Sequence, residues 1–321
     1  MINKKLLHNL LFEMIRMRRI EKKIASEYTA NPQEMRCPVH LSVGQEAIAA
    51  GISKNLREFD QVFSSHRCHY HYLAKGGSLK KMISELYGKV TGTCKGRGGS
   101  MHLFDSKVNF VAAVPIVGSI IPIAVGTAWN NKINKNNRKV VVYLGDGSTE
   151  EGVFQECLDF ASLMNLNILF VIENNNYSVY SNINKRQSPK RSITKLAEAS
   201  GISSNKMNGN DIINIYEKTK KILLNKKTPH LIEFSTFRML EHCGPNNDDD
   251  LNYRNGKEIK YWMKKCPIIN FQRYLLKEKL IKKSDLDIME IKIDKEILEA
   301  FNFAKKSSFP KKSSIMNYIY A

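Results

Sequence analysis

The stretch from residue 140 to residue 175 restricts the fold of this chain more than any other part of the sequence. Residues 140–144 form a continuous apolar run rich in β-branched side chains, and residues 168–172 form a second. Short apolar runs of this kind are typical of strands buried on both faces of a parallel sheet. With the residues between them, they have the usual length of a βαβ unit. We therefore expect an α/β fold with a mostly parallel sheet flanked by helices.

A tight turn follows the first predicted strand. It contains Gly145, Asp146 and Gly147, and Ser148 comes next. Together with Glu151, Ser148 predicts a capping box at the start of the intervening helix. The apolar residues of this helix recur at helical spacing, mostly on one face: Val153, Cys157, Leu158, Ala161 and Met164.

Other segments supply the elements around this unit. Apolar spacing predicts helices over residues 3–28, 44–57, 79–87 and 118–130, and strands over residues 61–64 and 231–237. Beyond Pro267 the chain reads as helical and charged up to Lys306, and a short tail follows. We expect one domain over residues 1–321, with an N-terminal helix and a helical C-terminal region over about residues 268–321.

Asp146 and Asn175 each lie just beyond the end of a predicted strand. Parallel strands end at the same edge of a sheet, where α/β proteins bind ligands, and a helix N-terminus there favours phosphate. A carboxylate at that edge would repel a diphosphate unless a cation lay between them, and Mg²⁺ prefers such oxygen ligands. Glu150 stands where a dinucleotide-binding GxGxxG turn has its third glycine. The turn therefore favours a metal-bridged diphosphate over a bare dinucleotide. Taken singly, Asp146 could simply cap the helix and Asn175 could simply form a turn.

These residues belong to a longer pattern that resembles the alpha subunits of thiamine-diphosphate-dependent 2-oxo acid dehydrogenases. Gly145-Asp146-Gly147 and, after residues 148–173, Asn174-Asn175 are similar to the thiamine-diphosphate motif. Further segments agree in their order along the chain: residues 40–47 (HLSVGQEA), 66–69 (HRCH), 98–102 (GGSMH) and 116–118 (IVG). The likeness extends from about residue 10 to Tyr320 and implies a thiamine-diphosphate-binding fold.

The resemblance implies thiamine diphosphate and Mg²⁺ as cofactors and assigns residues to them. Mg²⁺ would be bound by the side chains of Asp146 and Asn175 and by the backbone carbonyl of Tyr177. Arg67 suits the diphosphate because a guanidinium binds phosphate bidentately; a surface salt bridge is the plainer explanation of Arg67, as core packing is of Val117. The full set of expected cofactor contacts is His66, Arg67, Val117, Gly145, Gly147, Ser148 and His242.

Histidines are candidates for proton transfer because imidazole titrates near neutral pH. By resemblance, the candidate catalytic residues near the substrate are His40, His102 and His242, with loop packing as the alternative for His40 and His102. The resemblance is less specific for His69. We expect structural roles for the histidines that belong to no motif: His8, His71 and His230.

The resemblance also implies a reaction and its partners. The expected enzyme is an oxidoreductase of the pyruvate dehydrogenase type, which decarboxylates a small-molecule 2-oxo acid and passes the acyl group to a lipoyl acyltransferase. The glutamate that activates the cofactor would lie on a beta subunit. We therefore expect an α2β2 heterotetramer with the cofactor at the subunit interface, and no decarboxylation by this chain alone.

Residues 237–245 depart from the dehydrogenase pattern. Leu240 and Glu241 replace a histidine and a glycine, and Cys243 stands where many relatives have a serine that is phosphorylated. Control by phosphorylation is therefore not expected there, and the substrate stays open. The alternatives are an acetoin dehydrogenase, or a lipoyl-independent carboligase or decarboxylase subunit of a specialised pathway. A more remote alternative is a cofactor-binding scaffold without catalysis.

Composition narrows the possible partners. The net charge is +19, but the lysines are scattered among acidic residues and no nucleic-acid-binding motif accompanies them, so we expect no nucleic-acid partner. No apolar run reaches the roughly 18 residues of a membrane span, and the N-terminus does not resemble a signal peptide. We therefore expect a cytoplasmic protein that does not bind a membrane. The six cysteines lack zinc-site spacing, which favours free thiols.

Overall fold

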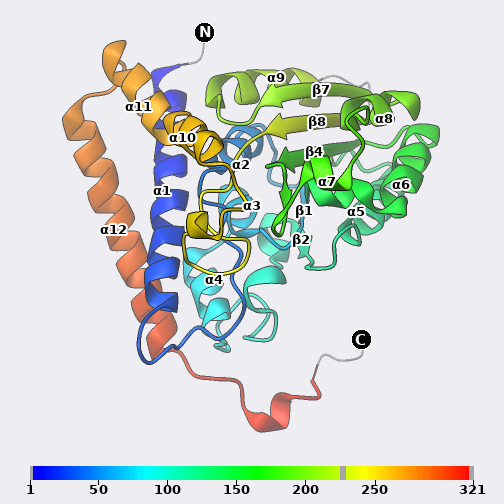
Figure 1. Cartoon of the computed structure of the whole chain (residues 1–321). Helices are drawn as coiled ribbons and strands as arrows, with labels where there is room; N and C mark the ends of the chain where they lie inside the picture. The colour runs from blue at the N-terminus through cyan, green and yellow to red at the C-terminus, as the bar shows by residue number, and fades with distance from the viewer. Residues whose placement is uncertain (1–2, 225–228, 318–321) are drawn as a thin grey trace.

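The computed structural model describes residues 3–224 and 229–317 and confirms the α/β fold (Figure 1). Within these residues, a six-stranded sheet has the strand order β2-β1-β3-β4-β8-β7, and every neighbouring pair is parallel. A short antiparallel hairpin of β5 (Tyr177–Ser178) and β6 (Ser181–Asn182) stands apart from it. The strands of the sheet are β1 (Gln61–Ser64), β2 (Phe110–Ala113), β3 (Val140–Gly145), β4 (Ile168–Asn174), β7 (Ser203–Asn208) and β8 (His230–Ser235).

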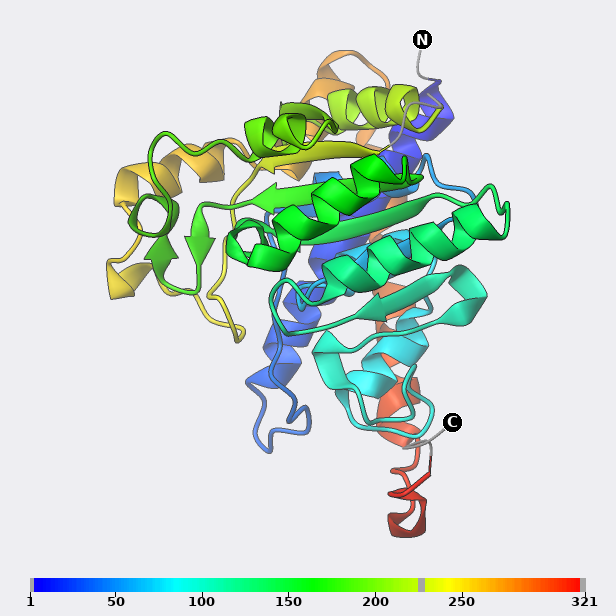
Figure 2. The same cartoon turned by 90° about the vertical axis from the view of Figure 1, so that its right-hand side faces the viewer.

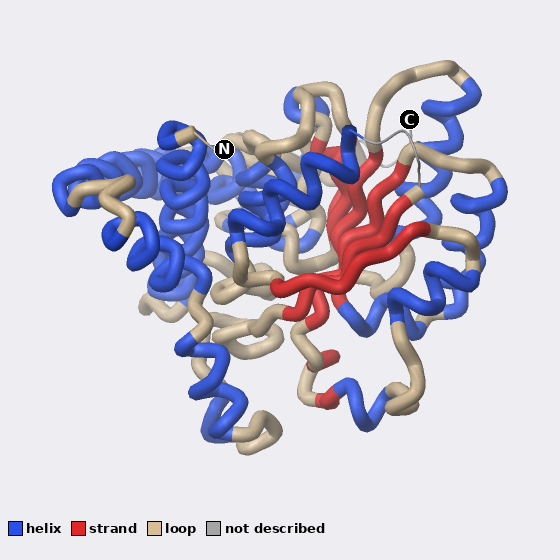
Figure 3. The backbone as a smooth tube through the Cα atoms, turned by 90° about the horizontal axis from the view of Figure 1, so that it is seen from above, coloured by secondary structure: helices blue, strands red, loops and turns tan. Residues whose placement is uncertain are grey.

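Helices cover both faces of the sheet (Figures 2 and 3). Successive strand residues point to opposite faces, so the apolar runs of β3 and β4 supply both layers of core. Val142 and Ile172 belong to the core under α5 (Ile120–Ile133), α6 (Gly152–Leu163) and α8 (Ile193–Ala199). Val141 and Val171 belong to the opposite core. The helices that contribute to that second core are α1 (Lys4–Tyr28), α2 (Glu46–Ser53), α3 (His69–Ala74), α4 (Leu79–Leu86), α9 (Ile212–Leu224), α11 (Pro267–Lys277) and α12 (Lys283–Lys306).

The first and last long helices lie side by side at one end of the molecule (Figure 1). The predicted N-terminal helix is confirmed as α1, and the predicted charged helical region beyond Pro267 is confirmed as α11 and α12. Ion pairs join the two long helices: Arg16–Glu296 at 2.7 Å, Arg19–Asp294 at 2.7 Å and Arg19–Glu290 at 3.3 Å. Residues 318–321 of the predicted C-terminal region lie outside the described residues.

The predicted capping box at Ser148 is wrong. Residues 146–150 form a 3-10 helix, and α6 begins only at Gly152, after Glu151 in an extended conformation. The hydroxyl of Thr149 donates to the carbonyl of Asp146 at 2.7 Å, which closes the tighter turn. Ser148 therefore lies inside the turn rather than before a helix, and the side chain of Glu151 makes no capping hydrogen bond.

Most other predicted elements are present, with shifted ends. α2 is shorter than the helix predicted over residues 44–57, while β1, α4, α5 and β8 lie close to their predicted ranges. The sequence prediction did not include β2 or β7. The six cysteines are free thiols, as predicted. Among the helices that the structure describes, none combines the length and apolarity that crossing a membrane requires.

Candidate active site

A cavity of about 240 Å³ lies at the carboxyl ends of β1, β3 and β4. β3 and β4 are aligned with Gly145 opposite Glu173, and neighbouring strands lie about 4.8 Å apart. The residues that follow each strand therefore converge on one place. All but one of the predicted site residues line this cavity: His40, His66, Arg67, Val117, Gly145, Asp146, Gly147, Ser148, Asn175, Tyr177 and His242.

The exception is His102. Its ring is exposed, and Nδ1 lies 2.9 Å from the carbonyl oxygen of Gly98 in its own loop. The neighbouring Met101, rather than His102, is among the described residues that line the cavity. A direct role of His102 in proton transfer stays a prediction, and the geometry shows only the loop contact.

Two side chains with oxygen atoms that could bind a metal ion, Asp146 and Asn175, line the cavity just beyond β3 and β4. Asp146 is only 1% exposed, and Asn175 is also buried. The side-chain oxygen of Asn175 accepts the backbone N–H of Tyr177 at 3.1 Å, which folds this loop back over the strand end. A carboxylate, an amide oxygen and a nearby backbone carbonyl form the kind of ligand set that Mg²⁺ prefers.

Arg186 contacts the carboxylate of Asp146, and no sequence pattern predicted this contact. Arg186 is the last residue of the short helix α7 (Ile183–Arg186); its guanidinium donates to Asp146 at 2.5 Å and pairs with Glu150. Burial raises the pKa of Asp146, and the contact with Arg186 opposes that rise. Arg186 is not among the described residues that line the cavity.

Replacing Arg186 with glutamine is expected to lower the free energy of unfolding at pH 7 by about 1.5–3 kcal/mol, because the buried Asp146 carboxylate loses its charged partner. Urea unfolding followed by circular dichroism measures this change. Lys185→Gln is the matched control, since it removes the same charge from an exposed neighbouring position and should cost less than about 0.5 kcal/mol. Equal stability of the two variants would contradict the pairing.

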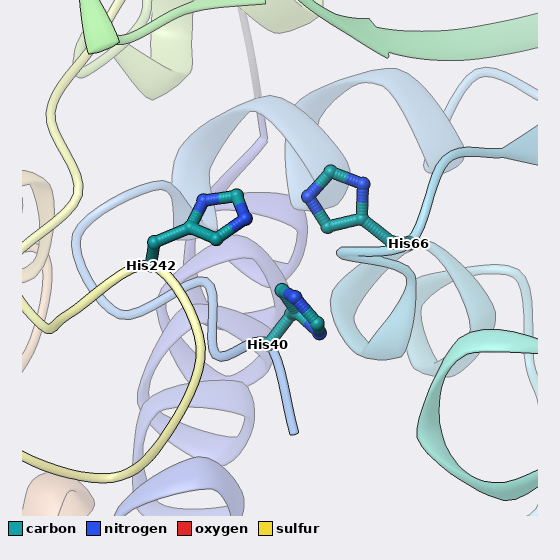
Figure 4. Close-up of side chains that lie close together, drawn as sticks. All are labelled: His40, His66 and His242. Atoms are coloured by element: carbon teal, nitrogen blue, oxygen red, sulfur yellow. The ribbon is translucent and has the colours of Figure 1, made fainter. Parts of the chain in front are cut away.

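Three histidines that line the cavity converge on one another (Figure 4). The rings of His40, His66 and His242 have centroids 4.7, 5.1 and 5.5 Å apart, and one nitrogen of each lies within 4.8 Å of the others. Burial, and next the charge of Arg67, lower the pKa to about 3 for His40 and His242 and to about 2 for His66. All three imidazoles are therefore neutral at pH 7.

Arg67 brings a positive charge to the cavity beside the three histidines. Its guanidinium is buried and donates to the carbonyl oxygens of Leu41 at 2.6 Å and His242 at 3.1 Å. Burial, and then the charge of Arg238, lower the pKa of Arg67 to about 9, so it remains a cation at neutral pH. Two nearby guanidinium groups oppose the binding of a metal ion by the three histidines and favour an anionic ligand.

The three histidines should make the protein less stable in acid. Because the pKa of each lies below the unfolded value of about 6.5, the unfolded chain binds more protons, and the free energy of unfolding falls as the pH falls from about 6.5 toward 3. Each histidine contributes up to about 1.4 kcal/mol per pH unit. His66→Asn should remove one such contribution, so its slope should be smaller than that of the unmodified chain. Urea unfolding at a series of pH values measures both slopes, and identical slopes would contradict this account.

Val117 lies at the cavity wall rather than in the core. Its side chain is 41% exposed, and Pro115 lines the cavity beside it. Core packing, the plainer explanation of Val117, therefore does not apply within the described residues. An apolar side chain at this place could contact a ring of a bound cofactor.

Histidines outside the cavity have partners in the protein. Nδ1 of His69 lies 3.2 Å from the carboxylate of Glu21, and its Nε2 lies 2.8 Å from the hydroxyl of Ser100. His8 contacts the carbonyl oxygen of Leu280, and His230 contacts the side chain of Asn205. His71 contacts the side chains of Ser64 and Glu173. These contacts agree with the structural roles expected for the histidines without a motif.

Comparison with known proteins gives the family. The family model for the dehydrogenase E1 component matches residues 12–313. The chain is 35% identical to subunit alpha-3 of the chloroplastic pyruvate dehydrogenase E1 component of Arabidopsis thaliana, over 88% of this chain and 67% of that protein.

Two bacterial relatives are covered more completely. The chain is 30% identical to the alpha subunit of the pyruvate dehydrogenase E1 component of Rickettsia bellii, over 96% of this chain and 94% of that protein. It is 34% identical to the alpha subunit of acetoin:2,6-dichlorophenolindophenol oxidoreductase of Bacillus subtilis, over 88% and 84%. The predicted resemblance to alpha subunits of thiamine-diphosphate-dependent 2-oxo acid dehydrogenases is confirmed, and the chain belongs to the dehydrogenase E1 component family.

Proposed function

We propose that this chain is the alpha subunit of a pyruvate-dehydrogenase-type enzyme that decarboxylates a 2-oxo acid together with a beta subunit. One observation supports the proposal most strongly: a single cavity is lined by Asp146, Asn175, Arg67 and the three histidines His40, His66 and His242. The side-chain oxygens of Asp146 and Asn175 suit a metal ion, and the guanidinium of Arg67 suits the diphosphate that the ion would bind. The relatives named as pyruvate dehydrogenase alpha subunits support this assignment.

The residues present fit thiamine diphosphate and Mg²⁺, although the role of each residue is a proposal. Mg²⁺ would be held by the carboxylate of Asp146, the amide oxygen of Asn175 and the backbone carbonyl of Tyr177, all oxygen ligands. The turn leaves open space beside Gly145, where a Cβ would meet no atom within 4 Å, and a diphosphate could lie there. At Gly147 a Cβ would lie only 3.1 Å from the Ser178 hydroxyl.

The remaining residues of the cavity would bind and orient the cofactor and its substrate. Thiamine diphosphate supplies the electron sink for decarboxylation. Arg67 and the backbone N–H groups of Gly147 and Ser148 would donate to phosphate oxygens, while Val117 would pack against a ring. His40, as a neutral imidazole, could accept or hold a proton near the substrate. The further contacts expected are those of His66, Gly145 and His242.

The family supports a proposal about the assembly. The family implies a beta subunit; we further propose that the two chains form an α2β2 heterotetramer with the cofactor at their interface. Transfer of the acyl group to a lipoyl acyltransferase is part of the same proposal. The cytoplasmic location stays a prediction from the sequence.

Copurification of the chain with its beta subunit, followed by a screen of substrates, tests the proposed function. With thiamine diphosphate and Mg²⁺ present, release of carbon dioxide from pyruvate or another 2-oxo acid is expected, and it should exceed the oxidation of acetoin. Preferred oxidation of acetoin would replace the substrate assignment. Failure of the complex to bind thiamine diphosphate, with no reaction of any 2-oxo acid, would refute the proposal.

A further inference from the structure

Gln45 brings an unused amide group to the cavity. The residue lines the cavity and is only 1% exposed, and neither its side-chain nitrogen nor its oxygen has a hydrogen-bond partner among the described residues. Nδ1 of the neighbouring His40, itself 8% exposed, is likewise without a partner within residues 3–224 and 229–317. Buried polar groups are nearly always hydrogen-bonded, so two at one cavity point to a ligand.

Hydrogen bonds and a buried ion pair hold the backbone around Gln45 in place. The backbone N–H of Gln45 donates to the carbonyl of Ser42 at 2.9 Å, and the N–H of Ser42 donates to the carboxylate of Glu21 at 2.7 Å. The next residue, Glu46, is fully buried and pairs with Arg18 from α1. Two charged side chains of α1 thus fix the loop that presents Gln45.

Gly44 adds a further constraint to the same loop. Its φ is +108°, and a Cβ at this position would lie 2.4 Å from the carbonyl oxygen of Phe237. The backbone N–H of Gly44 also donates to Glu46 at 2.9 Å. The backbone at Gly44 therefore packs directly against the segment that leads to His242, and this packing holds the loop that carries Gln45 in place.

The chemistry around Gln45 selects the kind of ligand. A glutamine amide offers two N–H donors and one acceptor oxygen. Among the other residues that line this cavity, His40 is neutral and Arg67 is a cation, so the cavity favours an anionic ligand. A 2-oxo acid carries a carboxylate and an adjacent ketone, and all of their oxygen atoms accept hydrogen bonds.

We propose that Gln45 is a substrate-binding residue, whose amide N–H groups donate to the oxygen atoms of the 2-oxo acid. This inference rests on the proposed function of the cavity and extends it to the group that recognises the substrate. The amide makes no hydrogen bond within the described part of the chain. The buried position of this amide is instead explained by a hydrogen bond that forms only when the substrate is bound.

Gln45→Met tests this role because methionine keeps the length of the side chain and removes both polar atoms. In the complex with the beta subunit, the KM for the 2-oxo acid is expected to rise at least tenfold, while the Kd for thiamine diphosphate, measured calorimetrically with Mg²⁺, changes less than twofold. The Tm should rise by about 2–4 °C, because an unpartnered buried amide is removed. Gln45→Glu should raise the KM further than Gln45→Met, since a carboxylate repels the anionic substrate.

Thr219→Val is the matched control. The hydroxyl of Thr219 is also fully buried and without a partner among the described residues, but Thr219 lies on α9 and does not line the cavity. This variant should raise the Tm in the same way and leave the KM unchanged. An unchanged KM in Gln45→Met, a lower Tm, or a loss of cofactor affinity larger than the rise in KM would each overturn the role of Gln45. If the unmodified complex does not bind thiamine diphosphate, the proposed function fails instead.

Discussion

Asp146→Asn is expected to weaken Mg²⁺-dependent binding of thiamine diphosphate at least about 100-fold and to reduce turnover to the same extent. Loss of a group that only orients a metal ligand costs 10–100-fold in affinity or activity, so loss of a charged ligand itself should cost no less. The substitution keeps the size of the side chain but removes the charge that would face the cation. Titration calorimetry of the complex with thiamine diphosphate, at several Mg²⁺ concentrations, measures the effect.

Glu150→Gln is the control for this experiment. Glu150 contacts the same Arg186 but does not line the cavity, so its charge should matter little to the cofactor. We expect its affinity to stay within about threefold of the unmodified complex, since it lies outside the metal site. A similar loss in both variants would mean that the charge of the whole turn, rather than a metal contact of Asp146, determines binding.

The chain purified without its beta subunit is expected to show no measurable decarboxylation, and addition of the beta subunit should restore it. Among the described residues that line the cavity, the carboxylates are those of Asp146 and Glu173. The first is the proposed metal ligand, and the second contacts Nε2 of His71 at 3.2 Å. We therefore propose that the activating glutamate comes from the beta subunit.

Release of carbon dioxide from a 2-oxo acid, with thiamine diphosphate and Mg²⁺ at saturation, measures this dependence. The Asp146→Asn chain with beta subunit serves as the negative control, because both chains are present but the metal ligand is not. Turnover by the purified chain alone, at a rate close to that of the complex, would show that the cavity needs no second subunit.

The central strands could be predicted from sequence because tertiary structure and local preference agree there. β3 and β4 are buried on both faces, and this leaves an uninterrupted apolar run in the sequence. β7 could not be predicted in this way, since the strand lies at the edge of the sheet and its residues, Ser203 to Asn208, are mostly polar and partly exposed. The start of α6 was misplaced because a 3-10 turn and a helix cap share the same residue types.

Some residues of the candidate site could also be predicted from the sequence, and others could not. Residues that directly follow strands, such as Asp146 and Asn175, could be placed at the cavity because parallel strands share one edge. Arg186 could not, since it reaches Asp146 from a separate short helix and only the folded chain brings the two together. The orientation of His102 away from the cavity, and of Met101 toward it, is likewise decided by the path of one loop.

We propose that a divalent cation links the diphosphate to the strand ends at Asp146 and Asn175. The most direct test is a crystal structure of the complex with thiamine diphosphate and Mn²⁺ in place of Mg²⁺, with the metal located by its anomalous scattering. We expect one strong peak within about 2.0–2.3 Å of the Asp146 carboxylate and the Asn175 amide oxygen, shared with the diphosphate. A diphosphate bound in the cavity with no metal between these two side chains would contradict the account.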